Sequence, residues 1–199
     1  VLNSFKKCVK ELHFEALFFI MKGKILISSP SLLSDMIFYK SIILIVDETD
    51  EGHTGFILNR PGGLFLIKNK NNSFGKKYEF NFGGPVSEHT FYIIRNHNIY
   101  NESLVIDDNL YWGNDVQLII DKVEAGKIDL EDVLFFQGYS GWETEQLNDE
   151  IESNSWIVID RLDKDIFDLG NKNSWNKIIN ELDNKYKIWS NSPDDISLN

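Results

Sequence analysis

The sequence predicts one α+β domain, in which strands come mostly before helices. Short apolar runs rich in β-branched residues and bounded by Gly, Pro, Ser or Asp recur through the chain, a pattern typical of strands. Segments with helical period occur mostly later, and one of them separates two groups of strands. This order lacks the strict alternation of a doubly wound sheet. With 199 residues, of which 42% are hydrophobic, the chain is long enough to bury one substantial core.

Eight strands are expected from the apolar runs. Residues 42–46 and 133–136 are almost continuously hydrophobic, which indicates strands buried on both faces, because a strand with one face in water would alternate. The expected strands are residues 25–27, 42–46, 56–58, 80–82, 91–95, 104–106, 133–137 and 156–159.

The first of three expected helices has the clearest period. Its apolar residues recur at i, i+3, i+4 and i+7. Asn114 is the expected N-cap and Gly126 the expected C-terminal stop. The apolar residues are Val116, Ile119, Ile120 and Val123.

Two more helices are expected towards the C-terminus. One covers about residues 143–153, where Leu147 and Ile151 form a narrow stripe on an otherwise solvated helix. The other begins behind Ser174, whose hydroxyl can cap the first turn. It is expected to cover the core with Trp175, Ile178, Ile179, Leu182 and Tyr186.

The charge balance disfavours one class of partner. The chain has 20 Lys and Arg against 31 Asp and Glu, a formal net charge of −11. Such a surface repels a phosphate backbone, whose neutralisation by Lys and Arg supplies most non-specific affinity for nucleic acid. Duplex DNA is therefore an unfavourable partner, and a basic or neutral molecule is easier to accommodate.

Cysteine usage and the N-terminal residues indicate the compartment and the domain boundary. Cys8 is the single cysteine, so an intrachain disulfide is impossible and a reducing, cytoplasmic location is expected.

The apolar run at residues 16–21 is shorter than a membrane span or a secretory core. Residues 1–20 are either a native short helix or an extension before an initiating Met21. Residues 21–199 are expected to form the single domain.

Residues 138–142, Gly-Tyr-Ser-Gly-Trp, lie between an expected strand and an expected helix, which is the setting of a hydrolase nucleophile elbow. The elbow needs glycine two positions after the serine, and Trp142 stands there. The last histidine, His97, precedes Ser140, although triad order alone excludes nothing. A structural turn is favoured over a nucleophile by about nine to one, so no catalytic residue is assigned.

Two further blocks have both a functional and a structural interpretation. Arg60, in Asn59-Arg60-Pro61, can clamp a carboxylate or phosphate with two hydrogen bonds. An internal ion pair is favoured by about three to one in a chain this acidic. Gly83-Gly84-Pro85 can present backbone N–H groups to an anion, but a tight turn between strands needs the same residues and is favoured.

The motifs imply no metal and no cofactor. The four histidines lack metal-ligand spacing, and the chain has neither a GxxxxGK[ST] phosphate loop nor a GxGxxG fingerprint. Four lysines at residues 68–78 are interleaved with Phe74 and Tyr78, a mixture that can bind single-stranded nucleic acid. The same composition is typical of a solvated, mobile loop.

Several blocks, taken together and in this order, resemble the bacterial YqgE/AlgH family, also called UPF0301. They are residues 24–33, residues 41–48, residues 51–61, Gly83-Gly84-Pro85-Val86, and Gly138-Tyr139-Ser140-Gly141-Trp142 followed by Gln146, Leu147 and Glu150. The resemblance implies a mixed, mostly antiparallel sheet that is partly closed into a small barrel and flanked by helices. Members of this family are often labelled transcriptional regulators.

The same resemblance suggests the positions that a ligand or partner would use. They are Asn59, Arg60, Pro61, Gly83, Gly84, Pro85, Tyr139, Trp142, Gln146 and Glu150. A scaffold role is the alternative: the glycines permit positive φ, Trp142 fills the base of a helix, and Gln146 with Glu150 bonds to neighbouring amides.

Three functions follow from these observations. The favoured one is a non-catalytic cytoplasmic protein that regulates through a protein or small-ligand partner. The second is a regulator that binds DNA directly, which needs a basic recognition helix, whereas the expected helices at 115–125 and 143–153 are acidic. The third is a serine hydrolase that uses Ser140.

Overall fold

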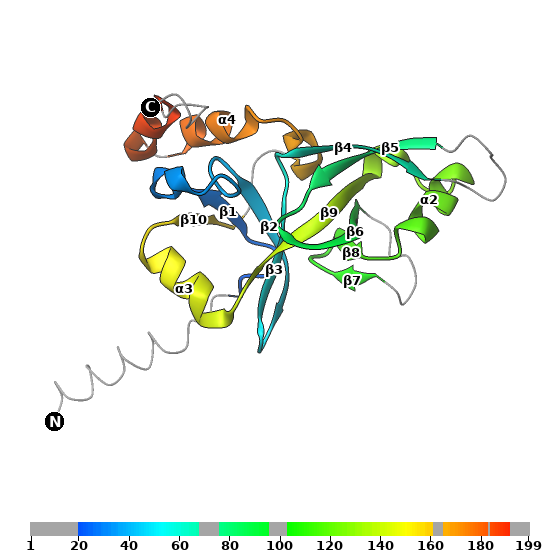
Figure 1. Ribbon diagram of the computed structural model, residues 1–199, viewed down its shortest axis with the longest axis horizontal. Coiled ribbons are helices and arrows are strands. Elements are labelled where there is room, and N and C mark those ends of the chain that lie inside the picture. The colour runs from blue at the N-terminus through cyan, green and yellow to red at the C-terminus, as the bar shows by residue number, and fades with distance from the viewer. Residues whose placement is uncertain (1–19, 68–75, 96–102, 161–164, 183, 192–199) are drawn as a thin grey trace.

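The computed structural model describes residues 20–67, 76–95, 103–160, 165–182 and 184–191 (Figure 1). The structural statements below concern these residues. Residues 1–19 of the expected N-terminal helix or extension lie outside them, as do residues 68–75 of the expected loop.

Ten strands pair into one mixed sheet. Eight of them follow the order β10-β1-β2-β3-β9-β6-β8-β7, while β5 joins by pairing with β9 and carries β4 on its other side. The β5–β9 pair is parallel and the other pairs are antiparallel. The strands are β1 (Ile25–Ser28), β2 (Ile42–Thr49), β3 (Gly52–Ile57), β4 (Pro61–Ile67), β5 (Lys76–Phe82), β6 (Val86–Arg95), β7 (Leu104–Val105), β8 (Leu110–Gly113), β9 (Val133–Trp142) and β10 (Trp156–Ile159).

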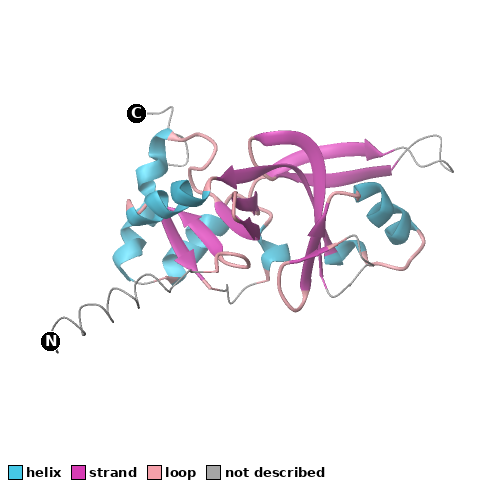
Figure 2. Cartoon of the chain, turned by 90° about the horizontal axis from the view of Figure 1, so that it is seen from below, coloured by secondary structure: helices cyan, strands magenta, loops and turns pink. Residues whose placement is uncertain are grey.

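The predicted fold class is confirmed, because a mixed, mostly antiparallel sheet is flanked by helices. The strands curve strongly (Figure 2), yet the described strands pair along an open path rather than a ring. The sheet therefore curves without closing into a barrel.

Several strands differ from the prediction in their existence or bounds. β4 and β8 are additional strands: β4 starts with Pro61-Gly62-Gly63, residues typical of a turn, and β8 has only four residues. Residues 76–78, expected in a loop, begin β5. The turn predicted at residues 138–142 is wrong, because β9 continues through Trp142. Gly138, with φ of 70°, lets β9 pass against the backbone of Gly84 without ending.

In the described part of the chain, three α-helices flank the sheet, as expected. They are α2 (Val116–Glu124), α3 (Thr144–Glu152) and α4 (Ser174–Glu181). The 3-10 helices are η1 (Pro30–Ser34), η3 (Leu130–Asp132), η4 (Ile166–Leu169) and η5 (Asn184–Asn191). No helix in the described part of the chain has the length and apolar character needed to cross a membrane.

Both predicted N-caps are wrong by one residue. Asp115, rather than Asn114, accepts the backbone N–H of Leu118 at 3.0 Å, and its negative charge suits a helix N-terminus. Ser174 is the buried first residue of α4, and Asn173 precedes it without a side-chain cap. The last helix is also shorter than predicted, since Tyr186 lies in η5.

Each helix covers a separate part of the core. Trp175 of α4 is fully buried and donates its indole N–H to the carbonyl of Ser28 in β1 at 2.9 Å. Ile119 of α2 packs in a cluster with Tyr78 of β5, and Leu147 of α3 packs in a third cluster with Trp142. These three contacts fix the helices against different regions of the sheet.

Candidate functional site

The predicted site residues form two groups in the structure. One group lies at the base of the β4–β5 hairpin, immediately before β4 and immediately after β5. The other runs from the end of β9 into α3 (Figure 1).

Asn59 connects the approach to β4 with the start of β2. Its side-chain oxygen accepts the backbone N–H of Ile42 at 2.9 Å, and its side-chain amide donates to the carbonyl of Lys40 at 2.8 Å. The residue is buried. Both the oxygen and the nitrogen of its side-chain amide are therefore engaged in fixing a loop.

Arg60 holds the same loop from the outside. Its two terminal nitrogens donate to the carbonyls of Met36 and Tyr39, each at 3.0 Å. Burial lowers the pKa of the guanidinium, and the negative charge of Asp35 opposes that shift. The internal partner of Arg60 is thus a pair of backbone carbonyls, with Asp35 nearby, rather than the carboxylate ion pair expected from composition.

Gly83 and Gly84 bring the end of β5 against β9. A methyl group on Gly83 would overlap the carbonyl oxygen of Gly138, and one on Gly84 would overlap the backbone of Tyr139 and Ser140. Gly84 also has φ of 151°, a conformation that side chains rarely adopt. Residues 83–85 do connect two strands, as predicted, but β5 and β6 both pair with β9 and not with each other, so the connection is not a tight hairpin turn.

Ser140 lies beneath this turn and its hydroxyl is engaged. The residue is 0% exposed, and the hydroxyl donates to the carbonyl of Gly83 at 3.1 Å. His53 lies in the neighbouring strand, but it pairs with Trp142 and directs Nε2 to Glu48. Among the described residues, the hydroxyl of Ser140 therefore has neither solvent access nor a histidine as a base.

The second group is built around the carboxylate of Glu150. One of its oxygens accepts the indole N–H of Trp142 at 2.9 Å and that of Trp156 at 2.7 Å. The other accepts the side-chain amide of Gln146 at 2.9 Å. Gln146 in turn accepts the backbone N–H of Glu143, forming a capping box at the start of α3. Sequence reasoning found Gln146 and Glu150 but missed Trp156.

A packed loop, rather than an open cleft, connects the two groups. Arg60 and Asn59 fix residues 36–40 as described above, and Phe38 of this loop packs on Trp142 and Trp156, with ring centroids 6.0 and 5.8 Å apart. Trp142 is itself buried. Of the predicted positions, Pro61, Pro85 and Gln146 are exposed, and Arg60, Tyr139 and Glu150 are partly exposed.

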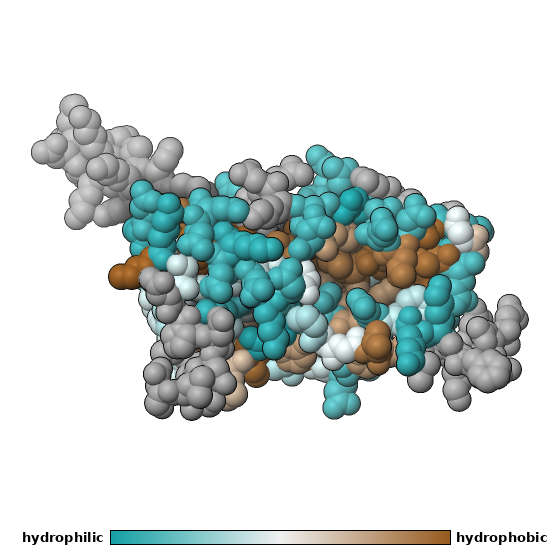
Figure 3. Space-filling model, turned by 90° about the horizontal axis from the view of Figure 1, so that it is seen from above, coloured by the Kyte–Doolittle hydropathy of each residue, from teal (hydrophilic) through white to brown (hydrophobic). Residues whose placement is uncertain are grey.

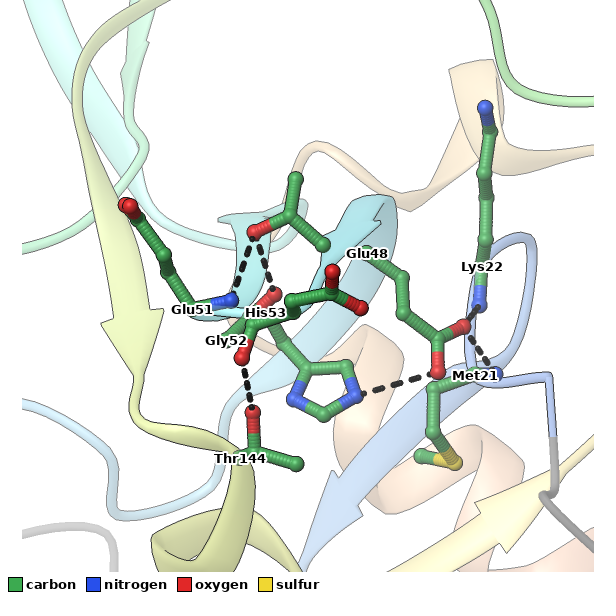
Figure 4. A network of polar contacts seen from close by, with 9 residues as sticks. Met21, Lys22, Glu48, Glu51, Gly52, His53 and Thr144 are labelled. Carbon is green, nitrogen blue, oxygen red and sulfur yellow. Dashed lines mark hydrogen bonds and ion pairs between the residues drawn. The ribbon is translucent and has the colours of Figure 1, made fainter.

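A further polar network, centred on Glu48, has no signal in the sequence. Figure 4 shows His53 pointing at one carboxylate oxygen of Glu48, at 3.5 Å, while the other oxygen accepts the backbone N–H groups of Met21 and Lys22. The side chain of His53 is 3% exposed, and its Nδ1 is buried without a hydrogen-bond partner. The network ties residues 21–22 to the β2–β3 hairpin.

Metal-ligand geometry is absent from the part of the chain that the structure describes. No three His, Cys, Asp or Glu side chains there are grouped to hold an ion. The described contacts instead define the class of protein. It is an α+β protein in which polar side chains of the sequence motifs form hydrogen bonds to its own loops and strands.

Comparison with known proteins identifies the family. A family model described as AlgH-like, DUF179, matches residues 25–187. The chain belongs to this AlgH-like family, which confirms the resemblance read from the sequence.

Relatives with the same label cover nearly the whole chain. A UPF0301 protein of Cytophaga hutchinsonii is 35% identical over 90% of this chain and 100% of the relative. A UPF0301 protein of Parabacteroides distasonis is 35% identical over 100% of both chains. The solution structure of the AlgH protein from Pseudomonas aeruginosa has a TM-score of 0.67 at 21% identity, covering 90% of this chain and 98% of that chain. This last likeness shows the fold.

Proposed function

We propose that this AlgH-like protein is a non-catalytic regulatory protein that acts by binding, and that the β4–β5 hairpin is the element it presents to a partner. The observation that carries the proposal is the state of Ser140. Its hydroxyl is buried and bonded to the carbonyl of Gly83, whereas a nucleophile needs an accessible oxygen and a base within hydrogen-bond reach.

The anchoring of the hairpin supports the second half of the proposal. Asn59 and Arg60 fix the chain directly before β4, and Gly83 and Gly84 fix it directly after β5. The two ends are joined by a hydrogen bond of 2.8 Å from the N–H of Phe82 to the carbonyl of Arg60. A hairpin held so firmly at its base presents its outer strand in a fixed orientation, which lowers the ordering cost of binding.

Direct DNA binding is the alternative, and the described helices support it poorly. α2 carries Lys122 together with Asp121 and Glu124. α3 carries four acidic residues and no basic one. A recognition helix in the major groove needs the opposite charge balance. Regulation through another protein is compatible with these surfaces, and a cytoplasmic location stays a prediction from the single cysteine.

An active-site serine probe tests the proposal against the hydrolase alternative. We expect a fluorophosphonate to leave the folded protein and its Ser140→Ala variant equally unmodified in intact mass spectra. Ser34→Ala, which removes an exposed hydroxyl, is the matched control. Modification of the wild type and of Ser34→Ala, but not of Ser140→Ala, would establish a nucleophile and overturn the proposal.

A mobility-shift titration at low salt addresses the DNA alternative. The negative net charge predicts no shift of duplex DNA at micromolar protein. A shift that weakens steeply as salt is raised would instead make direct DNA binding the better explanation.

A further inference from the structure

The outer edge of β4 is open and uncharged. β4 pairs with β5 on one side only, and its other edge pairs with no described strand. Its seven residues, Pro-Gly-Gly-Leu-Phe-Leu-Ile, include no charged side chain, although 26% of the whole chain is charged. Natural proteins usually protect such an edge with charge, because its free N–H and C=O groups are a template for another strand.

The exposed side chains of β4 are apolar as well. Leu64 is 61% exposed, while Phe65 packs back on Phe80 of β5 with ring centroids 4.5 Å apart. Seen from above in Figure 3, apolar surface gathers over the half of the molecule where β4 and β5 lie in Figure 1. The strand is thus anchored through one face and open along its edge.

We propose that this edge pairs with the same edge of a second copy of the chain, so that two β4 strands meet antiparallel about a two-fold axis. This inference rests on the proposed function and names the partner of its hairpin. A two-fold axis makes each contact occur twice, which requires a self-complementary edge. β4 meets that requirement, because no register within residues 61–67 brings like charges together.

The charge of the remaining surface also restricts where two copies can meet. Each carries a net charge of −11, so contact over most of the surface costs like-charge repulsion. β4 contributes no acid of its own to such a contact, although Glu79 of β5 lies opposite Leu64. Raising the salt concentration screens the remaining repulsion and should strengthen the association.

The size and shape of the edge set the strength and centre of the contact. The ladder of β4 with β5 is irregular between Pro61 and Gly63, and proline and bulges are devices that protect an edge. The pairing is therefore centred on Phe65, so that the two Leu64 residues lie on one face, diagonally across the pair. An interface built on so few residues falls below the roughly 1,200 Å² of a standard interface, so the dimer is weak and reversible, with a dissociation constant of about micromolar or higher.

Sedimentation equilibrium over a concentration series tests the proposal. We expect wild type to dimerise reversibly, and more tightly in 0.5 M than in about 0.05 M salt. Leu64→Lys and Leu64→Glu should each raise the dissociation constant at least about tenfold. An equimolar mixture of the two should regain dimers, because opposite charges then lie on neighbouring strands. Leu104→Lys, on the exposed edge strand β7 (52% exposed), is the matched control and should leave the association unchanged.

The possible outcomes separate this inference from the proposed function. A wild type that stays monomeric up to about 1 mM, or a dimer that Leu64→Lys does not weaken, overturns the second-copy proposal. Should the monomer bind a different protein in a manner that Leu64→Lys abolishes, the proposed function stands while this inference fails. Thermal midpoints within about 2 °C of wild type show that the variants are folded, and Leu64→Gln replaces any variant that is not.

Discussion

At the scale of single residues, Glu150 shows that a polar side chain of the sequence motif can serve to hold the fold together. Its carboxylate accepts two indole N–H groups and one amide N–H, from Trp142, Trp156 and Gln146. The three donors come from β9, β10 and α3 itself. A single carboxylate thereby fixes the helix to the sheet at the point where the family-like pattern ends.

Replacing Glu150 with alanine should therefore cost stability. Two largely buried indole N–H groups would lose their acceptor, and an unsatisfied buried donor costs about 1–3 kcal/mol. We expect Glu150→Ala to lower the free energy of unfolding by about 2–4 kcal/mol in urea titrations. Glu152→Ala, an exposed acid on the same helix, should change it by less than about 0.5 kcal/mol. Equal effects of the two variants would contradict the structural role of Glu150.

The sequence predicted that Gln146 and Glu150 form hydrogen bonds, but it did not predict all of their partners. The pattern predicted that Gln146 and Glu150 bond to neighbouring loop amides. The capping box confirms this for Gln146, whereas Glu150 accepts two indole N–H groups and the side-chain amide of Gln146. Trp156 as a partner was not predictable, because only the pairing of β10 with β1 brings it next to Trp142. His53 had no signal either, since a lone histidine in a strand says nothing about the carboxylate that folding places beside it.

At the scale of elements, most strands were predicted from the sequence, but β4, the strand with the open edge, was not. β4 begins with Pro61-Gly62-Gly63, which are turn residues in most contexts. Pairing with β5 overrides that local preference, and Phe65 stacking on Phe80 adds side-chain contact across the ladder. Non-local pairing of this kind leaves no periodic pattern that could reveal the strand beforehand.

A tyrosine that joins the hairpin to α2 should make stability depend on pH. Tyr78 of β5 donates its hydroxyl to Glu124 of α2 at 3.1 Å. Burial, that hydrogen bond and the charges of Glu124 and Asp121 together raise the pKa of Tyr78 to about 12. The folded state therefore keeps this phenol neutral more strongly than the unfolded chain does, whose tyrosines ionise near pH 10.

The sign of the effect follows from proton linkage. The stabilisation is fully present below about pH 10 and is lost as pH rises through about 12. As the pH rises from 9 to about 11.5, we expect the unfolding free energy of wild type to fall relative to that of Tyr78→Phe. Tyr78→Phe supplies the reference, because the other tyrosines and lysines titrate equally in both proteins. A difference between the two that stays constant over this range would contradict the assignment.

For the whole molecule, composition and element order were sufficient to predict an α+β domain, and the family resemblance supplied the mixed sheet. Strand order was not accessible, because β9 pairs with three strands, β3, β5 and β6, that come from separate parts of the chain. The sequence also could not distinguish a ligand-binding block from a scaffold block. In the sequence alone, Asn59, Arg60 and Ser140 are consistent with both a ligand-binding role and a scaffold role, and only their contacts in the structure distinguish the two.

Hydrogen exchange measured at low and high protein concentration distinguishes contact through the β4–β5 hairpin from contact through residues 138–150. We expect amide exchange to slow in peptides covering residues 61–67 as concentration rises, and this slowing to disappear in Leu64→Lys. Exchange in residues 138–150 should stay the same throughout. Slowing confined to residues 138–150, or no change at residues 61–67, would contradict contact through the β4–β5 hairpin.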